Sequence, residues 1–251
     1  MKYLNSLFFL TIIFSCSKNE SKKIVENNCN NIMEVYDYHP FENPIYQNTA
    51  TLTYNSDGKI KNIVGQRLSK AEYTYYNDSI VLKATSMNGM DNGQVYYLDN
   101  LQRITRKKYG NEDFQYNSEG YLISYKKPYE YNGQILGYAQ YFLVWQSGNL
   151  IRVYTNDQNA SIRDVVFEYY NLPNQNLLGY NSPFYYSNIL YDRNSFYLLN
   201  TSYYGKQSKD LLKSSIINGI YNQATDIIYQ SDATARIISL GYSYKFKYQC
   251  P

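Results

Sequence analysis

The chain has a single histidine among its 251 residues, and this scarcity excludes several kinds of catalytic site. A metal centre built from several histidines is impossible. A Ser-His-Asp triad would depend on His39, in the stretch "YDYHPF", and the sequence contains no G-x-S-x-G segment to supply the nucleophile. We therefore interpret His39 as a loop residue and predict that the protein binds no metal.

Other catalytic motifs are equally scarce. No glycine loop of the kind that cradles a phosphate occurs. Ser-x-x-Lys occurs at residues 56–59 and 124–127, but the S-D-N and K-T-G motifs that accompany it in β-lactamases are missing. Glu112 and Asp113 are adjacent, so on a strand they would face opposite sides instead of forming a carboxylate pair for glycoside hydrolysis. We place both in a solvated loop and predict a protein that is not an enzyme and needs no cofactor.

The chain also lacks an apolar run long enough to span a bilayer as a helix. Its N-terminus carries Lys2 and then an apolar run at residues 7–14, which has the length of a signal-peptide core and indicates export. The run ends in "IFSC", where Ile13, Ser15 and Cys16 resemble the lipobox of bacterial lipoproteins. That resemblance implies that Cys16 is lipidated and becomes the first mature residue. Phe14 departs from the motif, and a plain cleaved signal remains the alternative.

Three segments follow from this beginning. Residues 1–15 are the predicted signal peptide. Residues 16–34 are polar and without periodicity, which predicts a lipidated flexible tether. Residues 35–251 are predicted to form a single all-β domain, which the tether holds beside a membrane.

Cysteines are few, with three in the chain. If Cys16 carries lipid, Cys29 and Cys250 remain as a pair that could form a disulfide in an exported protein. Such a bond would staple the start of the domain to its last strand. Two free thiols are the alternative.

Charge of one sign is not in excess. Removing residues 1–15 takes away one lysine and no acid, leaving 23 basic and 21 acidic residues. This near balance indicates no nucleic-acid partner.

Tyrosine is abundant, with 33 residues, and it occurs within a repeated phrase. "LTYNSDGKIKNIV" at residues 52–64 is followed by "FQYNSEGYLISYK" at 114–126, and looser copies begin near residues 96, 143 and 227. Each phrase predicts a β-hairpin, because strand-like segments flank turn residues and a glycine that needs a positive φ. The glycine is kept at Gly58, Gly120 and Gly148, so we expect the other turns to use another conformation or length.

The strand pattern is clearest at the end of the chain, where four aromatic residues alternate with polar ones in "GYSYKFKYQ". Residues 208–216 fit either a helical turn or a strand. Together these patterns predict an all-β fold, an antiparallel meander of repeated β-hairpins that is strongly curved or closed into a soluble barrel-like sheet. The strands appear shorter than the 9–11 residues of a membrane barrel, which argues against a pore.

The turn phrases resemble the YD repeat of Rhs-type proteins, in which Tyr-Asp, a turn glycine and a basic residue recur. The whole chain is similar to an uncharacterised family of short Bacteroidota lipoproteins, a domain of unknown function described as porin-like in fold. The similarity runs from the lipobox through "TYNSDGKIKNI" and "YYGKQSKDLLKS" to "YKFKY". It implies fold and location, namely an exported protein lipid-anchored to the outer membrane, on the cell surface or the periplasmic face.

Aromatic side chains favour binding over catalysis, because tyrosine and tryptophan offer an apolar face with a polar tip. Trp145, the single tryptophan, is our candidate for stacking on a ligand, although aromatic residues at alternating strand positions usually belong to the core. We expect a non-catalytic surface module that binds a glycan or another surface ligand. The alternative is a structural role with an envelope protein as partner.

Overall fold

The computed structural model describes most of the chain after residue 30. The described ranges are 31–37, 48–65, 68–85, 93–108, 112–131, 134–160, 162–175, 177–186, 196–199, 201–219, 223–233, 236–240 and 244–249. Cys16, Cys29, His39 and Cys250 lie outside these ranges, as does the predicted signal peptide.

The described residues form seventeen strands in one sheet, and all the pairings between these strands are antiparallel. They are β1 (Asn31–Asp37), β2 (Asn48–Tyr54), β3 (Ile60–Gly65), β4 (Leu68–Tyr75), β5 (Ser79–Thr85), β6 (Gln94–Leu98), β7 (Ile104–Lys107), β8 (Asp113–Tyr116), β9 (Leu122–Tyr131), β10 (Gln134–Gln146), β11 (Asn149–Thr155), β12 (Ile162–Pro173), β13 (Asp210–Gly219), β14 (Gln223–Asp226), β15 (Tyr229–Ser231), β16 (Ile237–Leu240) and β17 (Tyr244–Gln249). The predicted all-β antiparallel meander is confirmed. Strand β1 begins at Asn31, four residues before the predicted start of the domain, and β9, β10, β12 and β13, with 10 to 13 residues, are longer than expected.

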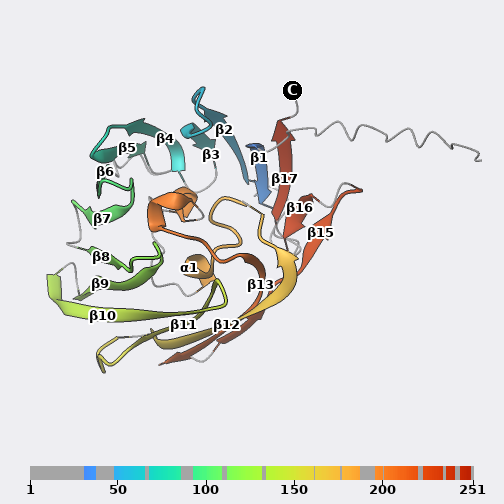
Figure 1. The fold of residues 1–251 in the computed structure, drawn as a ribbon. Coiled ribbons are helices and arrows are strands. Elements are labelled where there is room, and N and C mark those ends of the chain that lie inside the picture. The colour runs from blue at the N-terminus through green and yellow to red at the C-terminus, as the bar shows by residue number, and fades with distance from the viewer. Residues whose placement is uncertain are drawn as a thin grey trace, which may run out of the picture.

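The sheet curves back on itself, so that its first and last strands in the sequence, β1 and β17, lie side by side (Figure 1). Each strand from β1 to β13 pairs with the next, as far as β14, and β15 pairs with β16, which pairs with β17. The last strand, β17, then pairs with β1, with Asn31 opposite Gln249. Among the described residues no ladder joins β14 to β15, so the sheet is strongly curved without being closed by hydrogen bonds.

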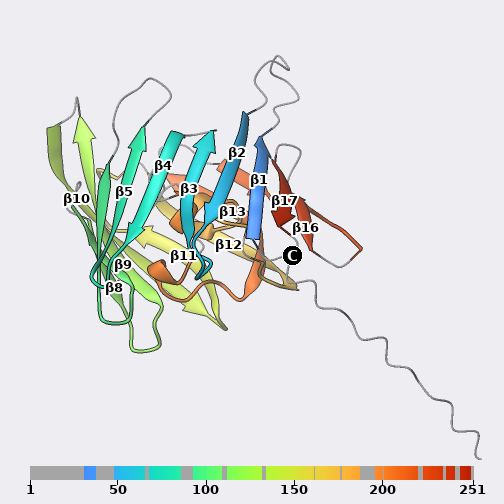
Figure 2. The same cartoon turned by 90° about the horizontal axis from the view of Figure 1, so that it is seen from above.

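Alternation along the strands sends apolar side chains inward and polar ones outward. In β4 and β5, Ala71, Tyr73, Ile80 and Leu82 are buried. The residues between them on β4, among them Glu72, are exposed. Figure 2 shows β1 to β5 side by side along this wall. The outer face of β4 is therefore hydrophilic, and the core lies inside the curve of the sheet.

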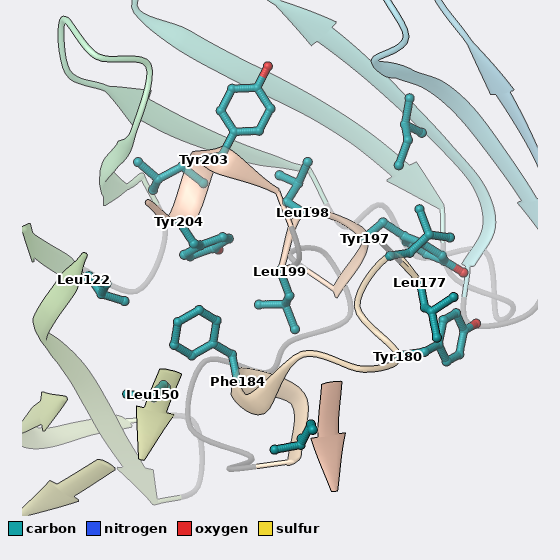
Figure 3. Packing of buried hydrophobic residues seen from close by; sticks show 14 of the residues in the cluster. Leu122, Leu150, Leu177, Tyr180, Phe184, Tyr197, Leu198, Leu199, Tyr203 and Tyr204 are labelled. Atoms are coloured by element: carbon teal, nitrogen blue, oxygen red, sulfur yellow. The ribbon is translucent and has the colours of Figure 1, made fainter. Parts of the chain in front are cut away.

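The inside of the curve is filled by the described residues between β12 and β13, namely 174–175, 177–186, 196–199 and 201–209, which we call the interior segment (Figure 1). Its described parts contain α1 (Pro183–Tyr186), η2 (Phe196–Leu198) and η3 (Ser202–Tyr204). Phe184 and Tyr204 pack against each other there with ring centroids 6.2 Å apart (Figure 3). Each side chain of this size contributes about 1.5–3 kcal/mol when fully buried. The interior segment thus supplies apolar side chains that pack against the inner face of the sheet.

The repeated phrase now has a physical explanation in a set of hydrogen bonds that we call the aromatic locks. In each lock a Tyr hydroxyl or the Trp indole N–H donates to the main-chain carbonyl of an isoleucine or leucine on an earlier strand, over 2.6–2.8 Å. The pairs are Tyr54–Ile32, Tyr75–Ile60, Tyr116–Ile104, Trp145–Leu122, Tyr169–Leu150, Tyr229–Leu212 and Tyr248–Ile237. In most of these pairs an aromatic residue at or near the end of one strand contacts an aliphatic residue at or near the start of another. Tyr229, the first residue of β15, and Tyr169, inside β12, are the exceptions.

In three locks a basic residue just before the aliphatic partner lies over the ring of the same lock. Lys59 lies 5.4 Å from the Tyr75 centroid, and the Arg103 guanidinium lies 4.5 Å from that of Tyr116. Arg236 over Tyr248 repeats the arrangement at 4.7 Å. These cation–π contacts explain why a basic residue recurs in the phrase. They do not by themselves establish the YD-repeat resemblance.

The turns at residues 55–59, 99–103 and 117–121 share one main-chain hydrogen-bond pattern, whereas Gly148 lies in the shorter turn between β10 and β11. Gly58, Gly120 and Gly148 have φ angles of 79°, 92° and 83°. Gln102 occupies the position of Gly58 in the turn at residues 99–103, with the same pair of main-chain hydrogen bonds and a φ of 62°. The expectation that a turn without glycine needs another conformation or length is thus wrong for this turn, because Gln102 adopts the left-handed conformation at a steric cost.

Candidate ligand-binding site

Trp145, the candidate stacking residue, lies on the inner face near the end of β10. Its indole N–H donates to the carbonyl of Leu122 over 2.7 Å, and the Tyr121 ring lies 4.6 Å away, centroid to centroid. The side chain is half-buried against the core. These contacts describe an aromatic lock, and ligand stacking on Trp145 stays a prediction.

The adjacent carboxylates point apart, as expected. Asp113 is exposed at the start of β8, whereas Glu112 Oε2 lies 2.8 Å from Nζ of Lys107, whose side chain is 1% exposed. Glu112 lies just before β8 and is partly buried, and Asp113 is the first residue of β8, so the solvated loop expected for both residues is wrong. Glu112 balances the charge of a buried lysine.

A cavity of about 300 Å³ lies between the wall and the interior segment, at the end of the sheet that carries the turns at residues 55–59 and 99–103, which we call the turn end. Its described lining comes from β1 to β4, from two hairpin turns and from the interior segment. The lining residues are Asn31, Ile32, Tyr54, Gly58, Lys59, Ile60, Tyr75, Gln102, Leu178, Leu198, Thr201, Ser202 and Tyr203. This volume suits a ligand at the small end of those that protein pockets hold.

The cavity has an apolar floor and a polar rim. Ile32, Leu178 and Leu198 are at most 5% exposed and form the floor. Lys59 and Gln102 are exposed at the rim. A ligand bound here would place an apolar surface inward and its polar groups outward.

Tyrosine rings form the side of the cavity. The rings of Tyr75 and Tyr203 stack with centroids 6.0 Å apart and planes 19° apart, and Figure 3 shows Tyr203 beside Leu198 on the interior segment. The hydroxyls of Tyr54 and Tyr75 are fixed by their locks on Ile32 and Ile60. The rings are thus held in place before any ligand arrives, which reduces the entropy that binding would cost.

The acid–base properties of these tyrosines favour binding over proton transfer. Burial raises the pKa of Tyr54 and of Tyr75 well above its usual range. Burial also raises the pKa of Tyr203. All three hydroxyls are therefore neutral near pH 7, whereas a general base has a pKa close to the working pH.

Lys59 is the one charged side chain among the described residues that line the cavity. Its Nζ lies 2.9 Å from Oδ2 of Asp57, and this carboxylate raises the pKa of the Lys59 ammonium. The hairpin turn fixes the backbone of Lys59, because Asn55 N–H donates to the Lys59 carbonyl over 2.8 Å. The site therefore presents a permanent positive charge at its rim.

Sequence reasoning missed this site because its lining comes from parts of the chain that are far apart, such as Ile32, Gln102 and Tyr203. The one local signal was the repeated turn, whose Gly58 and Lys59 form part of the rim. The described residues contain no group of three or more His, Cys, Asp or Glu that could hold a metal ion. In the same part of the chain, no helix has the length and apolar character needed to cross a membrane.

No family model and no curated protein matches the chain. Solved structures with a similar fold include a porin-like protein from Bacteroides uniformis ATCC 8492, with a TM-score of 0.58 and 14% identity over 86% of this chain and 96% of that one. They also include a porin-like protein from Bacteroides vulgatus ATCC 8482, with a TM-score of 0.56 and 15% identity over 87% of this chain and 98% of that one. These similarities confirm the porin-like fold that the sequence resemblance implied.

Proposed function

We propose that the protein is a non-catalytic binding module of the cell envelope that takes a small saccharide into the cavity at the turn end of the sheet. The observation that carries this proposal is the lining of that cavity, in which three tyrosine rings stand above an apolar floor and beneath a polar rim. A sugar ring has an apolar face and a periphery of hydroxyl groups, so it matches both surfaces.

The proposed location combines two features of the chain. Cys16 in its lipobox supplies the lipid anchor, and the tether places the folded sheet beside the outer membrane. The exposed outer side of β4, where Lys70 and Glu72 form an ion pair of 2.9 Å, suits contact with water. The porin-like proteins with similar structures are consistent with an envelope protein.

A glycan array screened with the full chain in detergent tests the proposal, followed by calorimetric titration of each hit. We expect saturable binding that Tyr203→Leu abolishes, because leucine keeps apolar bulk but removes the ring. Trp145→Phe is the matched comparison, since Trp145 does not line this cavity. Loss of binding only in Trp145→Phe would move the site to Trp145, and no binding to any glycan would refute the proposal.

A second candidate function, contact with an envelope protein, is supported by a row of exposed apolar side chains on the outer face. Val144 lies opposite Arg152, which lies opposite Val166, and Val166 lies opposite Ile216 on the next strand. The three apolar side chains are 37–42% exposed. Crosslinking from this row, in place of glycan binding, would favour the structural role.

A further inference from the structure

The charge of the cavity indicates which chemical class of saccharide it binds, on the assumption that the proposed function holds. Its described lining contains one cation, Lys59, and no carboxylate. Asp57, the counter-ion of Lys59, is exposed and does not belong to the described lining. The cavity itself is therefore electropositive.

The ion pair between Lys59 and Asp57 is easily exchanged. Its side chains are 42% and 51% exposed, and exposed pairs of this kind contribute little to stability. An anion that entered the cavity would meet an ammonium group already held over the Tyr75 ring. Exchanging Asp57 for that anion would cost little, because Asp57 remains solvated.

Lys59 differs in this respect from the cations at the same position in other turns. Arg103 and Arg236 pair with Asp99 and Asp232 at 2.7 and 2.8 Å, and their side chains are only 18% and 29% exposed. Neither arginine lines the cavity. Among these related turns, Lys59 is thus the cation placed to contact a ligand.

We infer that the cavity selects an acidic saccharide, whose carboxylate replaces Asp57 as the partner of Lys59 while its ring packs against the tyrosines. A hydrogen bond between two charged groups is stronger than one between neutral groups, and it forms here partly out of water. Lys59 is thereby a specificity residue, and the tyrosine rings and the floor supply the binding that neutral sugars share.

Matched ligand pairs test this inference. Methyl glycosides of hexuronic acids and of their neutral parent hexoses, in the gluco, galacto and manno series, differ only in a carboxylate or a hydroxymethyl group at C6. Titrated into the full chain in detergent, at least one acid should bind about tenfold or more tightly than its neutral parent. The preference should weaken as salt is raised.

Three variants make the test specific. Lys59→Gln should remove the preference for the acid, so that the acid and its neutral parent bind with equal affinity. Lys61→Gln removes the same charge two residues later, at an exposed position outside the cavity, and should keep the preference. Asp57→Asn should strengthen binding of the acid, because it removes the competing carboxylate.

The outcomes separate the inference from the proposed function. Equal binding of acid and parent in every pair overturns the inference and leaves the proposed function standing. A preference for the acid that survives in Lys59→Gln also overturns it. If neither member of any pair binds, the inference is overturned, and a glycan array that also shows no hit refutes the proposed function with it.

Discussion

The hydroxyl of Tyr116 donates a 2.8 Å hydrogen bond to the main-chain carbonyl of Ile104, and Arg103, the residue before Ile104, lies over the Tyr116 ring. The two contacts join residues at or beside the turn at 99–103 to a residue beside the turn at 117–121. A similar geometry recurs at Tyr75 and Tyr248. The sheet is therefore held at one end by side chains as well as by its ladders.

The first prediction tests one aromatic lock. Tyr116→Phe should lower the free energy of unfolding by about 1 kcal/mol, because the Ile104 carbonyl loses its donor at a part-buried position. Tyr97→Phe is the matched control, since Tyr97 lies under Arg106 at 4.5 Å in the same way but belongs to none of the locks. Urea unfolding followed by circular dichroism measures both. An equal loss in the two variants would contradict the lock.

The second prediction compares two glycines with nearly the same φ angle. Gly58 and Gly205 have φ angles of 79° and 80°. A Cβ at Gly58 meets no atom within 4 Å, whereas one at Gly205 would lie 2.5 Å from the Gly120 carbonyl oxygen.

Gly58→Ala should therefore cost about 1–2 kcal/mol, the penalty of the left-handed conformation alone. Gly205→Ala adds a clash with main chain that cannot move aside, and it should cost at least about 1–3 kcal/mol more. Thermal unfolding of the two variants gives the comparison directly. Equal melting temperatures would show that the interior segment does not pack tightly against the turn at Gly120.

The third prediction concerns alkaline pH. Burial raises the pKa of Tyr141 and of Tyr248 to about 12, from an ordinary value of 10.0. Because the folded pKa is the higher one, the stabilisation by these tyrosines is fully present below pH 10 and is lost as the pH rises towards 12. Absorbance at 295 nm should show tyrosine ionisation together with loss of structure in this window. Ionisation of these tyrosines near pH 10 with the fold intact would refute the prediction.

Hairpins were predictable because their signals are local: "NSDG" and "NSEG" each define a turn, and strands flank them. The interior segment was not predictable, because Phe184 and Tyr204 are buried by contacts with distant parts of the chain. The cavity could not be predicted for the same reason, since residues far apart in the sequence line it. Trp145 was the candidate because it is the single tryptophan. Its indole N–H donates to the carbonyl of Leu122, 23 residues away, and the sequence alone did not indicate this contact.

The last prediction concerns the two ends of the domain. In the sheet Asn31 lies opposite Gln249, on the neighbouring strands β1 and β17. Cys29 precedes Asn31 by two residues in the sequence and Cys250 follows Gln249 directly. We therefore predict a disulfide between Cys29 and Cys250, which would close a loop of about 220 residues and contribute roughly 5 kcal/mol in the chain-entropy model.

Peptide mapping without reductant should recover Cys29 and Cys250 in one linked fragment. Cys29→Ser and Cys250→Ser should each lower the melting temperature as much as the double variant does, because either substitution removes the same bond and the second then has nothing left to break. Additive losses would contradict the bond. So would two thiols that both react with iodoacetamide in the folded, unreduced protein, and the pairing of β17 with β1 would then hold the ends of the domain together by hydrogen bonds alone.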